Sequence, residues 1–317
     1  MLELAVVGAG IMGANHARVS ASLRDARVSV IVDPDEERGR VLAEAVGATW
    51  VPDVADAVGR VEGAIVAVPN ERHEEIATQL MRAGVGVLVE KPLAPTSEAA
   101  RRIVDVAALS EVVLAVGHVE RFNPAVLELD RLLGEIVHVS AARISAFSPR
   151  IRDGVVLDLM IHDLDIVRAV AGGEVESVSS VLSYPRSDTE DLAAALLTFD
   201  NAVTADLTAS RVGQNKIRQL QITQRESFVI VDLVRQDVTV HRVDHSEFLS
   251  SEGARYRQTG VVEIPYLENR GEPLLLQLEH FVRCLKGEQR PRVGGQDGLA
   301  AVALAEQVRA AAPARRQ

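Results

Sequence analysis

Five short apolar runs alternate with helical patterns along the first 120 residues, and this alternation restricts the possible folds more than any other feature of the sequence. Nearly continuous apolar runs of this length are typical of strands buried on both faces of a parallel sheet. The runs lie at Leu2–Val7, Val28–Val32, Gly63–Val68, Val85–Val89 and Val112–Val116. The helical patterns between them lie at Met12–Leu23, Pro34–Val46, Arg72–Ala83 and Ser97–Leu109. This order predicts a doubly wound α/β domain with right-handed crossovers.

Beyond residue 120 the pattern changes to alternating polar and apolar residues. Helices are predicted at Phe122–Leu133 and Val156–Ala171, with a strand at Ile136–Phe147 between them. Six period-2 segments follow at Val175–Tyr184, Leu192–Phe199, Ala202–Ser210, Ile217–Gln224, Ser227–Leu233 and Asp237–Val243. Two further helices are predicted at Pro273–Leu285 and Asp297–Ala312. Since 317 residues suit two domains, we predict the parallel-sheet domain at residues 1–120 and an α+β domain with a large open antiparallel sheet at residues 121–317.

The first apolar run leads directly into a G-x-G-x-x-G sequence that opens the first predicted helix, formed by Gly8, Ala9, Gly10, Ile11, Met12 and Gly13. The first glycine permits a tight turn, the second lets the backbone approach a pyrophosphate, and the third permits close packing. Asp33 ends the second run, where a carboxylate accepts hydrogen bonds from both ribose hydroxyls and repels a 2′-phosphate. We therefore predict a Rossmann-type site for NAD. NADP is less favoured but stays open, because Arg38 follows nearby.

The end of the third apolar run is a second place for cofactor contacts. Val68, Pro69 and Asn70 lie there, and such strand ends line the ligand crevice of open α/β sheets. We expect them to contact the ribose or the nicotinamide. His73, three residues further on, either faces the cofactor or caps its own helix, and the sequence leaves both alternatives open.

Composition excludes several other classes of function. The formal net charge is −11 and the isoelectric point is near 5.3, which argues against nucleic acid as a partner. No apolar run approaches the roughly 20 residues of a membrane span, so we expect no membrane contact and a cytoplasmic protein. Cys284 is the only cysteine, which leaves no internal disulfide. No cysteine pair or H-E-x-x-H sequence is present, and we expect no metal.

Glu90, Lys91 and Pro92 close the fourth apolar run. A G-x-G-x-x-G start, a strand-end acid and E-K-P together resemble the Gfo/Idh/MocA oxidoreductases, named for glucose–fructose oxidoreductase and inositol dehydrogenase. The resemblance implies that Lys91 lies at the junction of nicotinamide and substrate, beside Glu90, and that the Lys91–Pro92 peptide is cis. The family's second signature resembles D-x-G-x-H-x-x-D. It is matched here by Asp158, His162 and Asp165, with Met160 in place of the usual glycine.

These residues suit the oxidation of an alcohol, which requires a base near neutrality for the hydroxyl proton. We predict His162 as that base. Asp158 lies four residues earlier on the same predicted helix, where its carboxylate can hold the imidazole tautomer. Lys91 either stabilises the developing alkoxide as a cation or relays the proton itself.

A narrower similarity lies in the run G-H-V-E-R-F-N-P, residues 117–124. It resembles the branch of the family that oxidises UDP-sugars, such as UDP-N-acetylglucosamine, at the 3-hydroxyl. This implies that Glu120, Arg121 and Asn123 border the substrate, although a structural network between domains is the alternative. Three arginines are candidates for binding a diphosphate of the substrate: Arg143, Arg150 and Arg152. We favour Arg152 among them.

The leading hypothesis is therefore an NAD-dependent oxidoreductase whose substrate is a sugar nucleotide and whose product is a 3-keto sugar. A dehydrogenase of a free sugar or an inositol-like polyol is the second hypothesis. A non-catalytic NAD-binding regulator is the third, and it is disfavoured because Lys91, Asp158 and His162 are all present. The family resemblance also implies a homodimer or homotetramer.

Overall fold

The computed structural model describes residues 1–148, 153–242, 246–249, 255–258 and 260–314, and the chain divides into two compact units. Unit 1 combines residues 1–122 with 271–306, and unit 2 combines residues 123–270 with 307–317. This division differs from the expected one, which assigned everything after residue 120 to the second domain. The return of the chain has a packing reason: Leu278 and Phe281 are fully buried in a core cluster together with Leu4 and Ile65 of the N-terminal sheet.

Unit 1 contains a six-stranded sheet in the order β3-β2-β1-β4-β5-β6, and all of its neighbouring strands are parallel. The strands are β1 (Leu2–Val7), β2 (Ala26–Val32), β3 (Thr49–Val51), β4 (Gly63–Val66), β5 (Gly86–Glu90) and β6 (Leu114–Gly117). The five predicted runs are thus confirmed as strands. Strand β3 was not predicted, because three residues are too few to show a hydrophobic period.

Helices cover both faces of this sheet, as the alternation of buried residues along β1 shows. Leu4 and Val6 pack in one core cluster with residues of α1 and α7, whereas Ala5 and Val7 pack in another with residues of α3 and α4. The helices are α1 (Ile11–Ser20), α2 (Glu36–Val46), α3 (His73–Arg82), α4 (Ser97–Ser110), α7 (Pro273–Leu285) and α8 (Gly295–Ala311), with 3₁₀ turns η1 (Val54–Ala57), η2 (Asn70–Arg72) and η3 (Val119–Phe122). The last residues of α8, 307–311, belong to unit 2. The predicted doubly wound domain is therefore confirmed.

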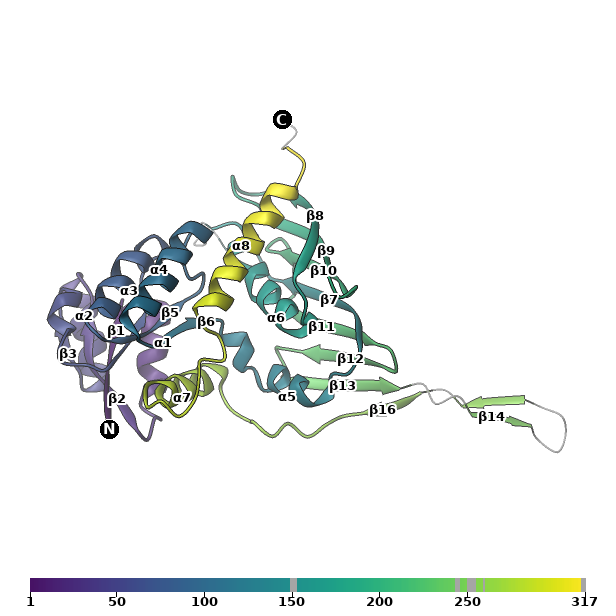
Figure 1. Cartoon of the computed structure of the whole chain (residues 1–317), viewed down its shortest axis with the longest axis horizontal. Coiled ribbons are helices and arrows are strands. Elements are labelled where there is room, and N and C mark those ends of the chain that lie inside the picture. The colour runs from purple at the N-terminus through teal and green to yellow at the C-terminus, as the bar shows by residue number, and fades with distance from the viewer. Residues whose placement is uncertain (149–152, 243–245, 250–254, 259, 315–317) are drawn as a thin grey trace. The chain divides into compact units, whose positions relative to one another are not determined.

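Unit 2 contains an eight-stranded sheet in the order β16-β13-β12-β11-β7-β10-β9-β8 (Figure 1). Only the β7–β10 pair is parallel, so the predicted antiparallel sheet is correct apart from this pair. The strands are β7 (Ile136–Ile144), β8 (Val175–Ser183), β9 (Leu192–Phe199), β10 (Thr204–Ser210), β11 (Ile217–Gln224), β12 (Ser227–Asp232), β13 (Asp237–Arg242) and β16 (Val261–Glu263). A separate two-stranded sheet is formed by β14 (Ser246–Leu249) and β15 (Arg255–Gln258).

The helices of unit 2 are α5 (Pro124–Leu132) and α6 (Ile161–Ala171). The segment Val156–Met160, directly before α6, is a π-helical turn, so the predicted helix at 156–171 is present but does not begin as an α-helix. Hydrophobic spacing does not distinguish a π turn from an α turn over so few residues. Within the described part of the chain, no helix is both long enough and apolar enough to cross a membrane.

A buried ion pair fixes α6 to the sheet of unit 2. Arg143 of β7 donates through Nε and Nη2 to the two carboxylate oxygens of Asp163 at 2.9 and 2.7 Å. Both side chains are almost completely buried. A guanidinium engaged in this way is not available to a substrate diphosphate, so the expected role of Arg143 is wrong. Its function is to position α6, the helix that carries His162.

Candidate functional site

A cavity of about 430 Å³ lies in unit 1 at the carboxyl ends of the parallel strands. This is the edge at which open α/β sheets bind their ligands. Five residues predicted for the cofactor line it: Gly8, Gly10, Asp33, Val68 and Pro69. Four residues that were not predicted also line it: Pro52 and Asp53, which follow β3, and Arg72 and Gln79. Knowledge of β3 would have found the first two, because the end of each parallel strand reaches the same edge.

The three glycines of the first turn each have a different environment, and together they fit a dinucleotide. Gly8 has φ of +98°, and a Cβ there would lie 2.5 Å from the carbonyl oxygen of Ala67. A Cβ on Gly13 would lie 1.8 Å from the carbonyl oxygen of Gly8. A Cβ on Gly10 would meet no atom within 4 Å, so open space lies in front of the N-terminus of α1. This is the place where helix amides bind a phosphate.

Three acidic residues line the cavity, Asp33, Asp53 and Glu75, and of these Asp33 is the buried one. Only 2% of Asp33 is exposed, and its carboxylate accepts hydrogen bonds from the backbone amides of Ala9 at 2.6 Å and Asp35 at 2.9 Å. Burial raises the pKa of Asp33, but hydrogen bonds from Arg38 and from the two amides outweigh burial, and the net pKa is lowered. The carboxylate is therefore ionised near neutral pH. An ionised acceptor at this position fits the ribose hydroxyls of NAD.

The other predicted residues of this region lie outside the cavity lining. Ile11 is 79% exposed and Met12 37% exposed, both in the first turn of α1 beside the open space at Gly10. Asn70 begins η2, directly after Pro69. Their contacts with the cofactor stay predictions.

His73 connects the two loops that follow β4 and β5. Its ring is 1% exposed, with Nδ1 2.9 Å from the carbonyl oxygen of Pro92 and Nε2 3.0 Å from that of Val68. The residue is not part of the cavity lining, and the residue that caps α3 is Arg72. A contact of His73 with the cofactor stays a prediction. Burial lowers the pKa of His73, while the two carbonyl groups and the charge of Glu90 raise it; the net pKa is lowered.

Glu90 links the turn that carries Lys91 to the glycine-rich helix. Its carboxylate lies 2.6 Å from Nε2 of the buried His16 of α1 and accepts a hydrogen bond from the Lys91 amide at 3.2 Å. Burial raises the pKa of Glu90, but the hydrogen bond to His16 and the charges of His16 and Lys91 lower it further than burial raises it. The Lys91–Pro92 peptide is cis, as the family resemblance implied. Glu90 is therefore a positioning residue within unit 1.

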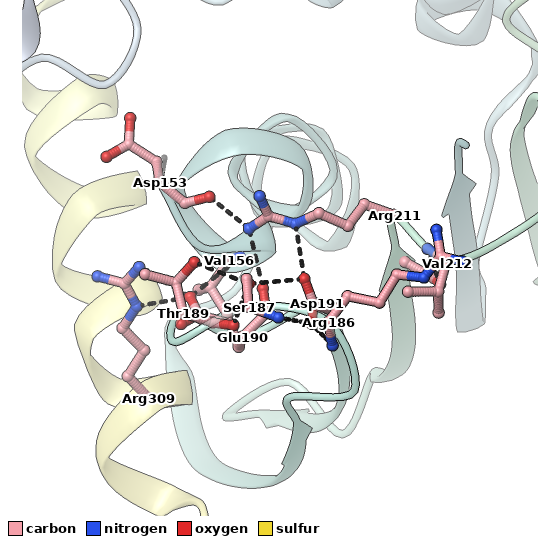
Figure 2. A network of polar contacts seen from close by, with 11 residues as sticks. Asp153, Val156, Arg186, Ser187, Thr189, Glu190, Asp191, Arg211, Val212 and Arg309 are labelled. Atoms are coloured by element: carbon pink, nitrogen blue, oxygen red, sulfur yellow. Dashed lines mark hydrogen bonds and ion pairs between the residues drawn. The ribbon is translucent and has the colours of Figure 1, made fainter. Parts of the chain in front are cut away.

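In unit 2, Asp158 lies in the π-helical turn and His162 in the first turn of α6. A polar network holds the backbone that leads into this turn (Figure 2). Arg211 donates to the carbonyl oxygens of Asp153 and Glu190, and the Val155 amide donates to the Glu190 carbonyl at 2.9 Å. The Glu190 carboxylate also accepts a hydrogen bond from Nη2 of Arg309 at 2.7 Å.

Two further features of this network restrict the same backbone. A Cβ on Gly154 would lie 2.1 Å from the Glu190 carboxylate, so the chain passes close to that group. Asp191 accepts hydrogen bonds from the Arg186 and Ser187 amides at 2.7 and 2.9 Å, and its carboxylate lies 3.5 Å from Nε of Arg211, which in turn holds Asp153. Burial raises the pKa of Asp191, but these hydrogen bonds and the charge of Arg211 lower it overall. The network therefore fixes the entry to the turn that carries Asp158.

The predicted substrate residues separate into three groups. Glu120 and Arg121 lie in η3 of unit 1, and their contact with substrate stays a prediction. Asn123 caps α5, accepting a hydrogen bond from the Ala125 amide at 3.1 Å and donating one to the Leu233 carbonyl at 2.9 Å. Its amide thus supports the fold, in line with the alternative of a structural network, and its contact with substrate stays a prediction. Arg150 and Arg152 lie outside the described residues.

The parallel sheet, the glycine turn and the strand-end carboxylate define an NAD-binding oxidoreductase domain. Comparison with known proteins makes this assignment more specific. Residues 2–118 match the oxidoreductase family with an NAD-binding Rossmann fold, and residues 97–226 match the GFO/IDH/MocA C-terminal domain. The chain belongs to the Gfo/Idh/MocA family of oxidoreductases.

Several relatives of this chain are dehydrogenases. The UDP-N-acetylglucosamine 3-dehydrogenase of Acidithiobacillus ferrooxidans is 28% identical over 99% of this chain and 98% of its own length. Its solved structure matches with a TM-score of 0.90 over 98% of this chain and 97% of that one. The scyllo-inositol 2-dehydrogenase (NAD(+)) of Bacillus subtilis is 27% identical over 92% of this chain and 88% of its own length. A levoglucosan dehydrogenase solved with NADH and levoglucosan has the same fold, with a TM-score of 0.84 at 20% identity, over 98% of this chain and 97% of that one.

The open space at Gly10 predicts a separation of stability from cofactor binding. We expect Gly10→Ala to leave the thermal midpoint nearly unchanged, because the added methyl group meets no atom within 4 Å. NAD affinity, measured by calorimetry, is expected to fall about tenfold or more, because that methyl group occupies the phosphate position. Gly271→Ala, at a position where a Cβ makes only ordinary contacts, is the control. Unchanged NAD affinity in Gly10→Ala would contradict this placement of the phosphates.

His73 predicts a pH-dependent stability of unit 1. Because the native pKa is lowered, the unfolded chain binds more protons as the pH falls through about 6.5, and the free energy of unfolding decreases. As the pH falls from ~7.5 to ~5.5, we expect the free energy of unfolding of the wild type to decrease by up to about 1.4 kcal/mol relative to that of His73→Gln. Denaturant titrations measure this free energy of unfolding. They are followed by the fluorescence of Trp50, which is the single tryptophan and lies in unit 1. Thr78→Ser in the same helix removes no titratable group and serves as control; equal pH slopes in wild type and His73→Gln would count against the prediction.

Proposed function

We propose that this chain is an NAD-dependent dehydrogenase that oxidises the 3-hydroxyl of UDP-N-acetylglucosamine to a 3-keto sugar nucleotide. The observation that carries the proposal is the length of the alignment with the Acidithiobacillus ferrooxidans enzyme, which includes 99% of this chain and 98% of that protein. Both units therefore have counterparts in that enzyme. The run at residues 117–124, which prompted the same hypothesis from sequence, is consistent with it.

The reaction removes two hydrogens from one carbinol group. The hydroxyl proton passes to a base, the hydrogen on carbon leaves with its electron pair, and a carbon–oxygen double bond remains. NAD, when bound, supplies the acceptor for that hydride. In the proposal His162 accepts the proton, Asp158 orients the imidazole, and Lys91 stabilises the negative charge that develops on oxygen.

Oxidation of an inositol-like polyol is the second candidate function. A specific observation favours it: the inositol 2-dehydrogenase 2 of Saccharopolyspora erythraea is 33% identical to this chain, although over only 65% of it and 66% of its own length. The Bacillus subtilis relative aligns over most of the chain. The two candidates use the same cofactor chemistry and differ in the substrate, so a substrate panel separates them.

The substrate test uses the purified full-length protein with NAD and follows the absorbance of NADH. We expect turnover with UDP-N-acetylglucosamine, and slower or no turnover with UDP-glucose, myo-inositol and glucose. Turnover of an inositol without turnover of any UDP-sugar would reverse the ranking of the two candidates. NAD binding without turnover of any compound in the panel would instead support a non-catalytic regulator.

The proposed catalytic roles predict a loss of rate without a loss of cofactor affinity. Lys91→Ala and His162→Ala are each expected to lower kcat about 100- to 10,000-fold, the usual contribution of acid–base catalysis. NAD affinity is expected to stay within about threefold of wild type. Added imidazole is expected to restore part of the activity of His162→Ala only. Lys216→Ala, which changes an exposed lysine, is the control; loss of NAD binding in both test variants would show that the roles are misassigned.

A further inference from the structure

The helical segment that leads into α6 begins without a cap from its own stretch of chain. Val155 occupies the N-cap position of the π-helical turn and makes no capping hydrogen bond with its apolar side chain. The first amides are instead bound by Glu190, which lies on the loop between β8 and β9. The Glu190 carbonyl oxygen accepts from the Val155 amide at 2.9 Å, and Oε1 of Glu190 accepts from the Val156 amide at 3.4 Å. A residue distant in the sequence thus replaces the local N-cap.

Glu190 is itself held from several directions (Figure 2). Its Oε1 accepts hydrogen bonds from Nε and Nη2 of Arg309 of α8 at 2.9 and 2.7 Å. Its carbonyl oxygen accepts one from Nη2 of Arg211 at 3.0 Å. The three nearest neighbours of a Cβ on Gly154 would be the carboxylate atoms of Glu190, at 2.1 to 2.2 Å, so only a glycine leaves room for them. Because only 8% of the Glu190 side chain is exposed, its charge depends on Arg309.

This support matters because the turn is not an ordinary helix. The Ile161 amide donates to the carbonyl oxygen of Val156, five residues earlier, which is the hydrogen bond of a π helix. Such a turn contains one residue more than an α-helical turn and is rare. Asp158 lies inside the turn and His162 lies after it, so the direction of one side chain relative to the other depends on the extra residue. Relaxation to an α-helix would rotate Asp158 by about 100° around the helix axis relative to His162.

We propose that Glu190 is a positioning residue that keeps the π-helical turn in its register, with Arg309 as the counter-ion that holds it there. The proposal rests on the proposed function, in which Asp158 orients the imidazole of His162. Glu190 acts through the backbone of residues 154–156 and not on the substrate. The loop between β8 and β9 and the C-terminal end of α8 then determine the geometry of the proposed acid–base pair.

The first test removes either side of the ion pair. Glu190→Ala is expected to lower kcat about 10- to 100-fold, because a displacement of about 1 Å in a catalytic group costs this much. NAD affinity is expected to stay within about threefold of wild type, since the change lies outside unit 1. Arg309→Ala is expected to lower kcat in the same way. Arg309→Lys is expected to retain most of the rate, because both guanidinium contacts go to one oxygen, which a single ammonium can serve.

The second test approaches the same contact through Gly154. The methyl group of Gly154→Ala displaces the carboxylate and is expected to lower kcat as much as Glu190→Ala does. In the double variant the two losses are expected not to multiply, because the methyl group enters the space that the carboxylate has left. Gly173→Ala is the matched control, since its Cβ would lie 2.6 Å from Oδ1 of Asp200, beyond the other end of α6. It introduces the same kind of clash and is expected to lower the thermal midpoint without lowering kcat.

Hydrogen exchange of the full-length protein, followed by mass spectrometry, gives a readout that needs no turnover. Amides of residues 155–162 are expected to exchange at least about tenfold faster in Glu190→Ala than in wild type, and at the wild-type rate in Gly173→Ala. The kinetic tests use whichever alcohol the wild type oxidises, so an incorrect assignment of the substrate does not affect them. If the wild type oxidises no compound of the panel, the proposed function has failed and the exchange measurement alone decides this proposal.

Three results would overturn the proposal. The first is a kcat, or without turnover an exchange rate, of Glu190→Ala within about twofold of wild type. The second is a double variant of Gly154 and Glu190 whose losses multiply. The third is a kcat of Gly173→Ala as low as that of Gly154→Ala. If Glu190→Ala does not fold, Arg309→Ala and its comparison with Arg309→Lys test the same contact.

Discussion

The hydrogen bond from the Ala9 amide to Asp33 joins the glycine turn after β1 to the end of β2, and the cofactor site depends on it. A buried carboxylate is costly unless donors surround it. The turn supplies one donor and the cap of α2 another, so the same acid stabilises two backbone segments and presents its charge at the strand ends. Arg38 completes the charge balance of the carboxylate. One side chain thus supports two backbone segments and places a negative charge at the cofactor cavity.

Unit 2 uses buried charge for a related purpose. The Arg143–Asp163 pair and the contacts of Arg211 are buried almost completely. Buried ion pairs are weak evidence for stability, because desolvation offsets much of the attraction. They do restrict geometry, since a buried charge that loses its partner is strongly penalised. We therefore attribute to them the placement of the turn and helix that carry Asp158 and His162.

The features that could be predicted from the sequence are those that a local pattern of residues determines. Five of the six strands of the parallel sheet were found because each is a continuous apolar run, and the glycine turn and Asp33 were found because their spacing is local. The contact between Arg38 and Asp33, the bridging position of His73 and the capping role of Asn123 were missed, because each depends on tertiary contacts between separate segments. The return of residues 271–306 to unit 1 was missed for the same reason, since an amphipathic helix does not reveal which sheet it covers.

Net charge places a constraint on how a sugar nucleotide would be recognised. The chain carries a formal charge of −11, so its long-range field opposes the approach of a diphosphate. Binding must then rely on short-range donors, such as arginine forks and backbone amides, that act within a few ångströms and are little affected by distant carboxylates. The cofactor site already shows this arrangement, with an open helix N-terminus for phosphate beside an acidic ribose site. A neutral polyol is not repelled by this field. A protein that binds a sugar nucleotide therefore needs local donors for the diphosphate, whereas a protein that binds a polyol does not.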